Sequence, residues 1–324
     1  MVRTHPRSLV LPLLLLGVLA CDDGAATPVP QRYSQVAAPP KDGPTVEYHD
    51  EARTKKRAAG EIKQGKPEGP WTSWHENGAI AAQGSYAAGM HAGPWTLFHP
   101  NGAKFSEATF VAGKFDGLVT EWHDNTQVSR KAHYAAGVLA GPCEEWYPNG
   151  QLFRSIEYVE GGIVGHVVEF HANGKRLREG EYVAGKQIGP WTSWHPNEQK
   201  SSEGAYVDGL QDGPWKSWHP NGQLEKEGRF TAGKHVGMWT VWAEDGRTVR
   251  QCEFADGLQH GKASAWHPNG KLASQGQFEL GKRVGEWRYW NEAGEPDLEQ
   301  SGLYQDDRRV AALAADGVNP AKDE

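Results

Sequence analysis

The sequence predicts an all-β protein: an elongated repeat ribbon or solenoid of ten 24-residue antiparallel β-hairpin units. Two observations lead to this prediction. Ten glycines recur at an unbroken spacing of 24 residues, and no stretch between residues 60 and 305 is both long enough and free enough of Gly and Pro to form a helix. Units of this size stack on their neighbours to bury an apolar face. The ten glycines are Gly69, Gly93, Gly117, Gly141, Gly165, Gly189, Gly213, Gly237, Gly261 and Gly285.

Two aromatic columns follow these glycines. The first lies two residues after each glycine, as in Trp71, and the second lies three residues further on, as in Trp74. Together they contain all 14 tryptophans of the chain. Because their spacing is odd, the columns are expected on opposite faces of the ribbon. The second column supplies the candidate partner-binding aromatics: Trp74, Phe98, Trp122, Trp146, Phe170, Trp194, Trp218, Trp242, Trp266 and Trp290.

Each unit contains a turn signal after its second aromatic. Seven of the ten units have Asn-Gly or Asp-Gly there, among them Asn77-Gly78 and Asn221-Gly222. Such pairs are a strong hairpin signal, because glycine accepts positive φ. We therefore regard these pairs, with Gly69 and Gly93, as structural turn residues.

The turn also predicts a register. Counting back from it places His75 opposite Ile80 and Trp71 opposite Gly84. We therefore expect the indole to cover the backbone of a glycine, which has no side chain of its own.

The two ends of the repeat differ from its middle. Residues 46–68 are predicted to form a degenerate first unit, residues 69–305 the repeats, and residues 306–324 a C-terminal cap and tail. The segment from Asp306 to Ala315 has a helix-like start, spaced apolar residues and a stop at Gly317. It is predicted to be a short capping helix.

The N-terminus predicts export. Arg3 and Arg7 precede an apolar run over residues 9–19, so residues 1–20 have the layout of a signal peptide. Residues 18–21 (Val-Leu-Ala-Cys) resemble the lipobox of bacterial lipoproteins, which predicts lipidation of Cys21. Residues 22–45 are rich in Pro and Ala, so 21–45 would be the lipidated cysteine and a tether. The expected product is an exported, membrane-anchored lipoprotein, on either the inner or the outer membrane; the alternative is an ordinary signal peptide.

The net charge of the chain indicates which partners are not expected, and the cysteine positions indicate whether a disulfide can form. Without the leader, 32 basic residues remain against 41 acidic ones, so nucleic acid is not an expected partner and anionic lipid is disfavoured as the main ligand. Cys143 and Cys252 fall in different columns more than four units apart, so they are predicted to be buried thiols without a disulfide.

No catalytic pattern stands out. Seven histidines form a column beside the turn, but equivalent side chains in neighbouring units are roughly 9.6 Å apart, too far to share a metal. Ring packing is expected for them, with a pH-responsive surface as the alternative. We expect no enzyme activity, no cofactor and no metal site. The column comprises His75, His99, His123, His171, His195, His219 and His267.

The pattern Gly-x-Trp-x-x-Trp-His-x-Asn-Gly, followed by Gly-x-Tyr-x-x-Gly, resembles the MORN-variant repeat over residues 60–305. It is similar in particular to bacterial repeat proteins of the YwqK antitoxin family. The resemblance implies a β-hairpin ribbon used for protein contacts.

Three functions are compatible with these observations. The first is an interaction scaffold of the cell envelope that binds an unknown protein through its aromatics. The others are neutralisation of a partner toxin and binding of cell-wall glycan. Some units are irregular: the first Trp is replaced by Val119, Cys143 and Val167, and the turn Gly by Thr126 and Glu198. These units would either mark a specific binding segment or reflect sequence drift without a function.

Overall fold

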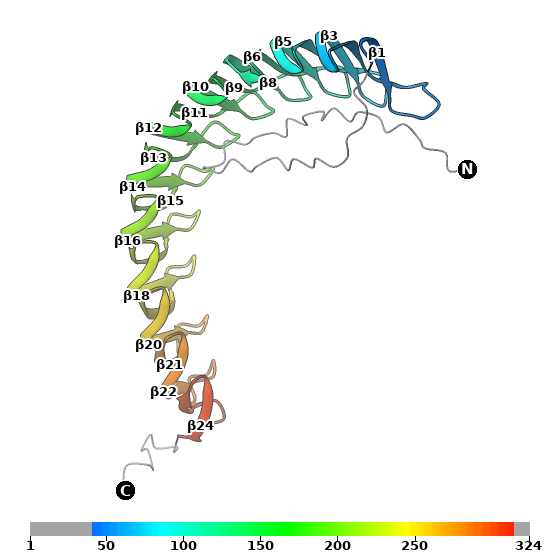
Figure 1. The fold of residues 1–324 in the computed structure, drawn as a ribbon. Helices are drawn as coiled ribbons and strands as arrows, with labels where there is room; N and C mark the ends of the chain where they lie inside the picture. Colours follow the sequence, from blue (N-terminus) through cyan, green and yellow to red (C-terminus); the bar gives the residue numbers. More distant parts are fainter. Residues whose placement is uncertain (1–40, 314–324) are drawn as a thin grey trace, which may run out of the picture. The chain divides into compact units, whose positions relative to one another are not determined.

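The computed structural model describes residues 41–313, in which every regular element is a β-strand (Figure 1). The all-β prediction is therefore confirmed. The strands are β1 (Gly43–Tyr48), β2 (Lys56–Lys63), β3 (Lys66–Trp74), β4 (Ile80–Ala87), β5 (Met90–Phe98), β6 (Lys104–Val111), β7 (Lys114–Phe115), β8 (Gly117–Trp122), β9 (Val128–Ala135), β10 (Val138–Trp146), β11 (Leu152–Val159), β12 (Gly162–Phe170), β13 (Arg176–Val183), β14 (Lys186–Trp194), β15 (Lys200–Val207), β16 (Leu210–Trp218), β17 (Leu224–Thr231), β18 (Lys234–Trp242), β19 (Thr248–Ala255), β20 (Leu258–Trp266), β21 (Leu272–Glu279), β22 (Lys282–Tyr289), β23 (Gly302–Gln305) and β24 (Arg308–Ala312).

The chain divides into two structural units. The first extends to Gly165 and includes 183–185; the second comprises 166–182 and the residues from Lys186 onward. Within each unit, strands pair antiparallel with their neighbours in sequence, as β14 to β22 show in Figure 1. The predicted signal peptide, Cys21 and most of the tether lie outside the described residues.

The Asn-Gly turn has one more residue than a two-residue hairpin. The amide of Gly78 donates to the carbonyl of His75 (2.9 Å), and the His75 amide donates to the carbonyl of Ala79 (2.8 Å). Of the Asn77-Gly78 pair only the glycine has positive φ (86°). This is a type I turn followed by a left-handed glycine, which introduces a bulge.

The bulge changes the register beside the turn. Trp71 does pair with Gly84, as predicted, but Ile80 pairs with Trp74. The predicted pairing of His75 with Ile80 is therefore wrong by one residue.

The glycine of the 24-residue period forms a second bulge. Ala59 pairs with Thr72 and Glu61 with Glu68, so residues 69–71 together face Gly60. Gly69 adopts a φ of 68° at this point, which an L side chain rarely accepts. The bulge turns Trp71 back over the preceding strand.

The first aromatic column forms the core. Its six tryptophans are all buried, at 4 to 9% exposure. They pack edge to face against a third set of aromatics, which lie on the strand after each Asn-Gly turn. In the second unit, for example, Tyr206 of β15 and Trp215 have ring centroids 5.4 Å apart at 90°. Cys143 and Cys252, which occupy different columns, are buried free thiols, as predicted.

The predicted capping helix is wrong. Asp306 (φ 49°) and Asp307 (φ 66°) form the turn between β23 and β24, and Gln305 pairs with Arg308. Residues 308–312 pair with β23 and therefore form a strand. The two aspartates, interpreted as a helix start, occupy the turn positions that Leu280 and Gly281 fill in the preceding hairpin.

Candidate functional site

Each tryptophan of the first column lies on a glycine of the preceding strand. A Cβ added to Gly84, for instance, would overlap the indole of Trp95. The sequence places Trp71 opposite Gly84, but its indole covers Gly60, because the bulge at Gly69 redirects it. The glycine and indole pairs are Gly60 with Trp71, Gly84 with Trp95, Gly180 with Trp191, Gly204 with Trp215, Gly228 with Trp239, and Gly276 with Trp287.

The positions that lack this tryptophan also lack the glycine. Where the first column has a smaller residue in place of tryptophan, the residue eleven positions earlier in the sequence is larger than glycine. The larger residue thus compensates in part for the missing indole, as expected where a core is densely packed. The pairs that lie within one unit are Ala108 with Val119 and Ala132 with Cys143 in the first unit, and Cys252 with Ala263 in the second.

The second aromatic column remains accessible. All ten rings are half-buried. Five of them have a cation over the ring, with Nζ or guanidinium carbon 5.3 to 5.8 Å from the centroid. These pairs are Lys56 with Trp74, Lys104 with Trp122, Lys131 with Trp146, Arg176 with Trp194, and Lys200 with Trp218.

The histidine column holds these aromatics in place. His195 Nε2, for example, lies 2.7 Å from the backbone oxygen of Trp218 in the next hairpin. The nitrogen that faces a carbonyl must carry the proton, so each ring donates this bond. The other bonds join His49 to Trp74, His75 to Phe98, His99 to Trp122, His123 to Trp146, His171 to Trp194, His219 to Trp242, and His267 to Trp290.

The turn asparagines form a parallel series of bonds. Asn221 Oδ1 accepts the amide of Gln223 (2.9 Å), which fixes the turn, and Nδ2 donates to the carbonyl of Glu244 in the next hairpin (2.7 Å). Asn77 does the same with Ala79 and Pro100. The Trp-His-x-Asn-Gly motif therefore sets both the turn and the spacing of successive hairpins.

A row of buried charges was not identified from the sequence. In the first unit Arg130 pairs across the strands with both Glu121 and Glu145, and the Arg130 Nη1 to Glu121 Oε2 distance is 3.4 Å. Arg154 Nε lies 2.8 Å from Glu145 Oε2. In the second unit Glu169 and Arg178 pair in the same way. The sequence does contain a pattern that indicates this row, because these glutamates and arginines each recur every 24 residues.

The charges in this row influence one another. Burial raises the pKa of Glu121, Arg130 opposes that rise, and Glu145 adds to it. All the carboxylates of the row have an arginine opposite, so the arrangement is an internal ion-pair row.

Within residues 41–313 no group of three or more His, Cys, Asp or Glu side chains is placed to hold a metal ion. In the same residues the structure contains no helix with the length and hydrophobicity needed to cross a membrane.

Comparison with known proteins identifies the repeat. Residues 67–88, 139–160, 211–232 and 259–279 match the family model described as MORN repeat variant. No curated protein matches the chain.

Similar solved structures are much larger proteins. The Tc holotoxin pore of Photorhabdus luminescens with a mutated TccC3 is 11% identical over 81% of this chain and 18% of that one, with a TM-score of 0.17. The crystal structure of TcdB2-TccC3 is 10% identical over 83% of this chain and 23% of that one, with a TM-score of 0.15. This chain thus spans less than a quarter of their length. The four matched segments, together with the all-β hairpin structure, show that this chain contains MORN-variant repeats.

Proposed function

We propose that this protein is a non-catalytic interaction scaffold of the cell envelope, anchored through lipidated Cys21, that binds a protein partner along its second aromatic column. The observation that supports the proposal is the arrangement of that column. Its rings are half-buried, and the histidine and asparagine bonds hold successive rings in register. Rigid aromatic side chains of this kind are enriched among residues that dominate binding energy.

The cations over five of the rings favour a protein over a glycan. A sugar that stacks on an indole needs its open face, and Lys200 lies 5.3 Å from the centroid of Trp218 on such a face. A protein partner with carboxylates can engage the cation and the ring together. Neutralisation of a toxin is a special case of the same contact, with the toxin as partner.

The test is crosslinking in the native host, followed by purification of the protein and mass spectrometry. We expect a stoichiometric protein partner with the wild type and its loss with a Trp194→Ala, Trp218→Ala double variant. A matched control is Val207→Ala with Leu210→Ala, which truncates exposed apolar residues at another turn. Muropeptides as the only product, or a partner retained by the aromatic variant with unchanged yield, would refute the proposal.

Anchoring is tested separately. Metabolic labelling with a fatty acid should mark the wild type, and Cys21→Ser should abolish both labelling and membrane sedimentation. Labelling that persists in Cys21→Ser would refute lipidation at this position without affecting the proposal about the aromatics.

A further inference from the structure

The ladder of indoles in the second unit is interrupted after Trp239. The next position of the column is Ala263, which pairs with Cys252. Elsewhere in this unit an indole covers the residue equivalent to Cys252, as Trp239 covers Gly228. The missing indole leaves space on the core face beside Trp239.

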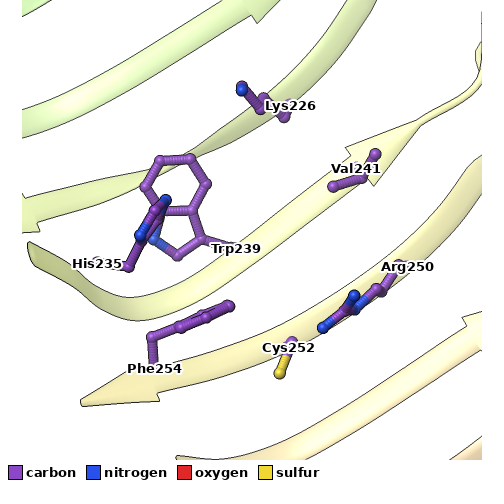
Figure 2. Close-up of a pocket in the computed structure, with 7 residues that line it drawn as sticks. All are labelled: Lys226, His235, Trp239, Val241, Arg250, Cys252 and Phe254. Carbon is purple, nitrogen blue, oxygen red and sulfur yellow. The ribbon is translucent and has the colours of Figure 1, made fainter. Parts of the chain in front are cut away.

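This space is a pocket of about 170 Å³. Figure 2 shows His235 beside the Trp239 indole, with Phe254, Cys252 and Arg250 on the next strand and Lys226 on the preceding one. The His235 and Trp239 rings are 4.4 Å apart at 68°, so the aromatic wall is firmly packed. The lining residues are Lys226, His235, Trp239, Val241, Arg250, Cys252 and Phe254.

Two cations lie at one side of the pocket, and the residue between them is not a carboxylate. Val241 pairs with Lys226 on one strand and with Arg250 on the other. Val241 holds the position of Glu121 and Glu145 in the repeat, which neutralise the arginines around them. Neither Lys226 nor Arg250 has an ion-pair partner among residues 41–313.

Two carboxylates adjoin Lys226 along the strand, and both are engaged elsewhere. Glu227 Oε2 lies 3.8 Å from Lys216 Nζ. Glu225 precedes Lys226, and its Oε2 accepts a hydrogen bond from Ser217 Oγ at 2.9 Å. The positive field of Lys226 reaches the pocket, because burial and that charge together lower the pKa of His235. The pocket is thus a positive, apolar-walled site on a chain whose net charge is −7.

We propose that this pocket binds an acidic peptide segment of a partner protein, with a carboxylate between Lys226 and Arg250 and a neighbouring apolar side chain against Trp239 and Phe254. The bound carboxylate takes the place that Glu121 and Glu145 occupy elsewhere in the repeat. A peptide suits the site better than a membrane, because a pocket of about 170 Å³ has the size of amino-acid side chains and the acidic chain as a whole is repelled by anionic lipid. The site uses the first aromatic column and is separate from the surface of the proposed function.

The experiment titrates the whole purified chain with the capped peptide Gly-Phe-Glu-Gly and with its Gln counterpart, followed by NMR of the indole of Trp239 and the ring of His235. We expect saturable shifts with the Glu peptide at millimolar concentration, about tenfold weaker binding with the Gln peptide, and a higher pKa of His235 in the complex. Inorganic phosphate and phosphatidylglycerol vesicles serve as competing probes.

The variants make the test specific. Lys226→Ala and Arg250→Ala should each weaken binding about tenfold, and Val241→Glu should abolish it by supplying the internal carboxylate. Because the fold already accepts Glu121 at that position, Val241→Glu is expected to fold normally. Lys262→Ala, on an exposed residue of the other face, is the charge-matched control and should bind as the wild type does.

The proposal is overturned if the Glu and Gln peptides bind equally, if Val241→Glu binds the Glu peptide unchanged, or if only phosphate or vesicles shift the His235 resonance. The Trp194→Ala, Trp218→Ala variant should bind the peptide normally. The two proposals therefore fail independently of each other.

Discussion

The indole of Trp95 lies directly on the backbone of Gly84, in a position where a single methyl group on the glycine would overlap the ring. The Nε1 of Trp95 donates a hydrogen bond of 2.9 Å to the carbonyl of Ser85, which fixes the ring against that strand. Since every tryptophan of this column has such a glycine, and every smaller residue lacks one, the two positions act as one packing unit.

Gly84→Ala should destabilise the protein by about 1 to 3 kcal/mol, because the added Cβ forces the indole off its site. Adding Trp95→Val should recover part of this loss, since it reproduces the pair of Ala108 and Val119. A double-mutant cycle by urea unfolding measures the coupling between the two residues. Additive effects, with Gly84→Ala as costly in the Trp95→Val background as in the wild type, would contradict the size matching.

Thr126→Gly should stabilise the protein by about 1 kcal/mol. Thr126 has a φ of 70°, which is unfavourable for a β-branched residue, whereas other turns have glycine there. Thermal unfolding measures the gain. The reciprocal change Gly102→Thr, at a φ of 86° in the preceding turn of the same type, should lower the melting temperature. A rise with both variants would show that turn conformation is not the cause.

Asn221→Ala should cost about 1 to 2 kcal/mol, because it removes the bond to Gln223 within the turn and the bond to Glu244 in the next hairpin. Asn221→Asp separates the two contributions, since a carboxylate keeps the first bond and loses the second. Hydrogen exchange of the Gln223 amide reports on the turn. Equal exchange rates for this amide in Asn221→Ala and Asn221→Asp would contradict the assignment.

Much of the fold could be predicted because its signals are local. The 24-residue glycine spacing and the Asn-Gly pairs gave the hairpins, and the pairing of Trp71 with Gly84 follows from counting. The glycine under each indole could not be obtained in this way, because the bulge at Gly69 carries Trp71 onto Gly60. Counting assumes regular alternation, and bulges are the places where alternation fails.

The error at the C-terminus has a similar origin. Asp306 and Asp307 favour both a helix start and a left-handed turn, and only pairing with β23 decides between them. The buried charges of Glu121 and Arg130 were missed because charged residues are usually exposed, although their 24-residue recurrence indicated a shared environment.

The stability conferred by Glu121 should depend on pH. Burial raises its pKa above the ordinary value of 4.5, so the folded protein binds a proton there more readily than the unfolded chain does. The stabilisation that Glu121 provides is fully present at a pH below the pKa that this residue has in the unfolded chain. It is lost as the pH rises through the higher pKa that Glu121 has in the folded protein. The free energy of unfolding of the wild type minus that of Glu121→Gln should therefore fall as the pH rises from 4.5, and level off above the folded pKa.

Arg130→Met should enlarge the pH dependence due to Glu121, because it leaves this carboxyl buried without the cation that opposes the rise in its pKa. At neutral pH we expect destabilisation of about 3 to 5 kcal/mol. The pKa of Glu121 should then rise further, so the pH-dependent loss of stability extends to higher pH than in the wild type. Urea-unfolding midpoints at a series of pH values measure both effects, and the double variant with Glu121→Gln serves as the control that lacks the titrating group. If the pH-dependent difference between Arg130→Met and the double variant coincides with the difference between the wild type and Glu121→Gln, Arg130 does not act on the pKa of Glu121.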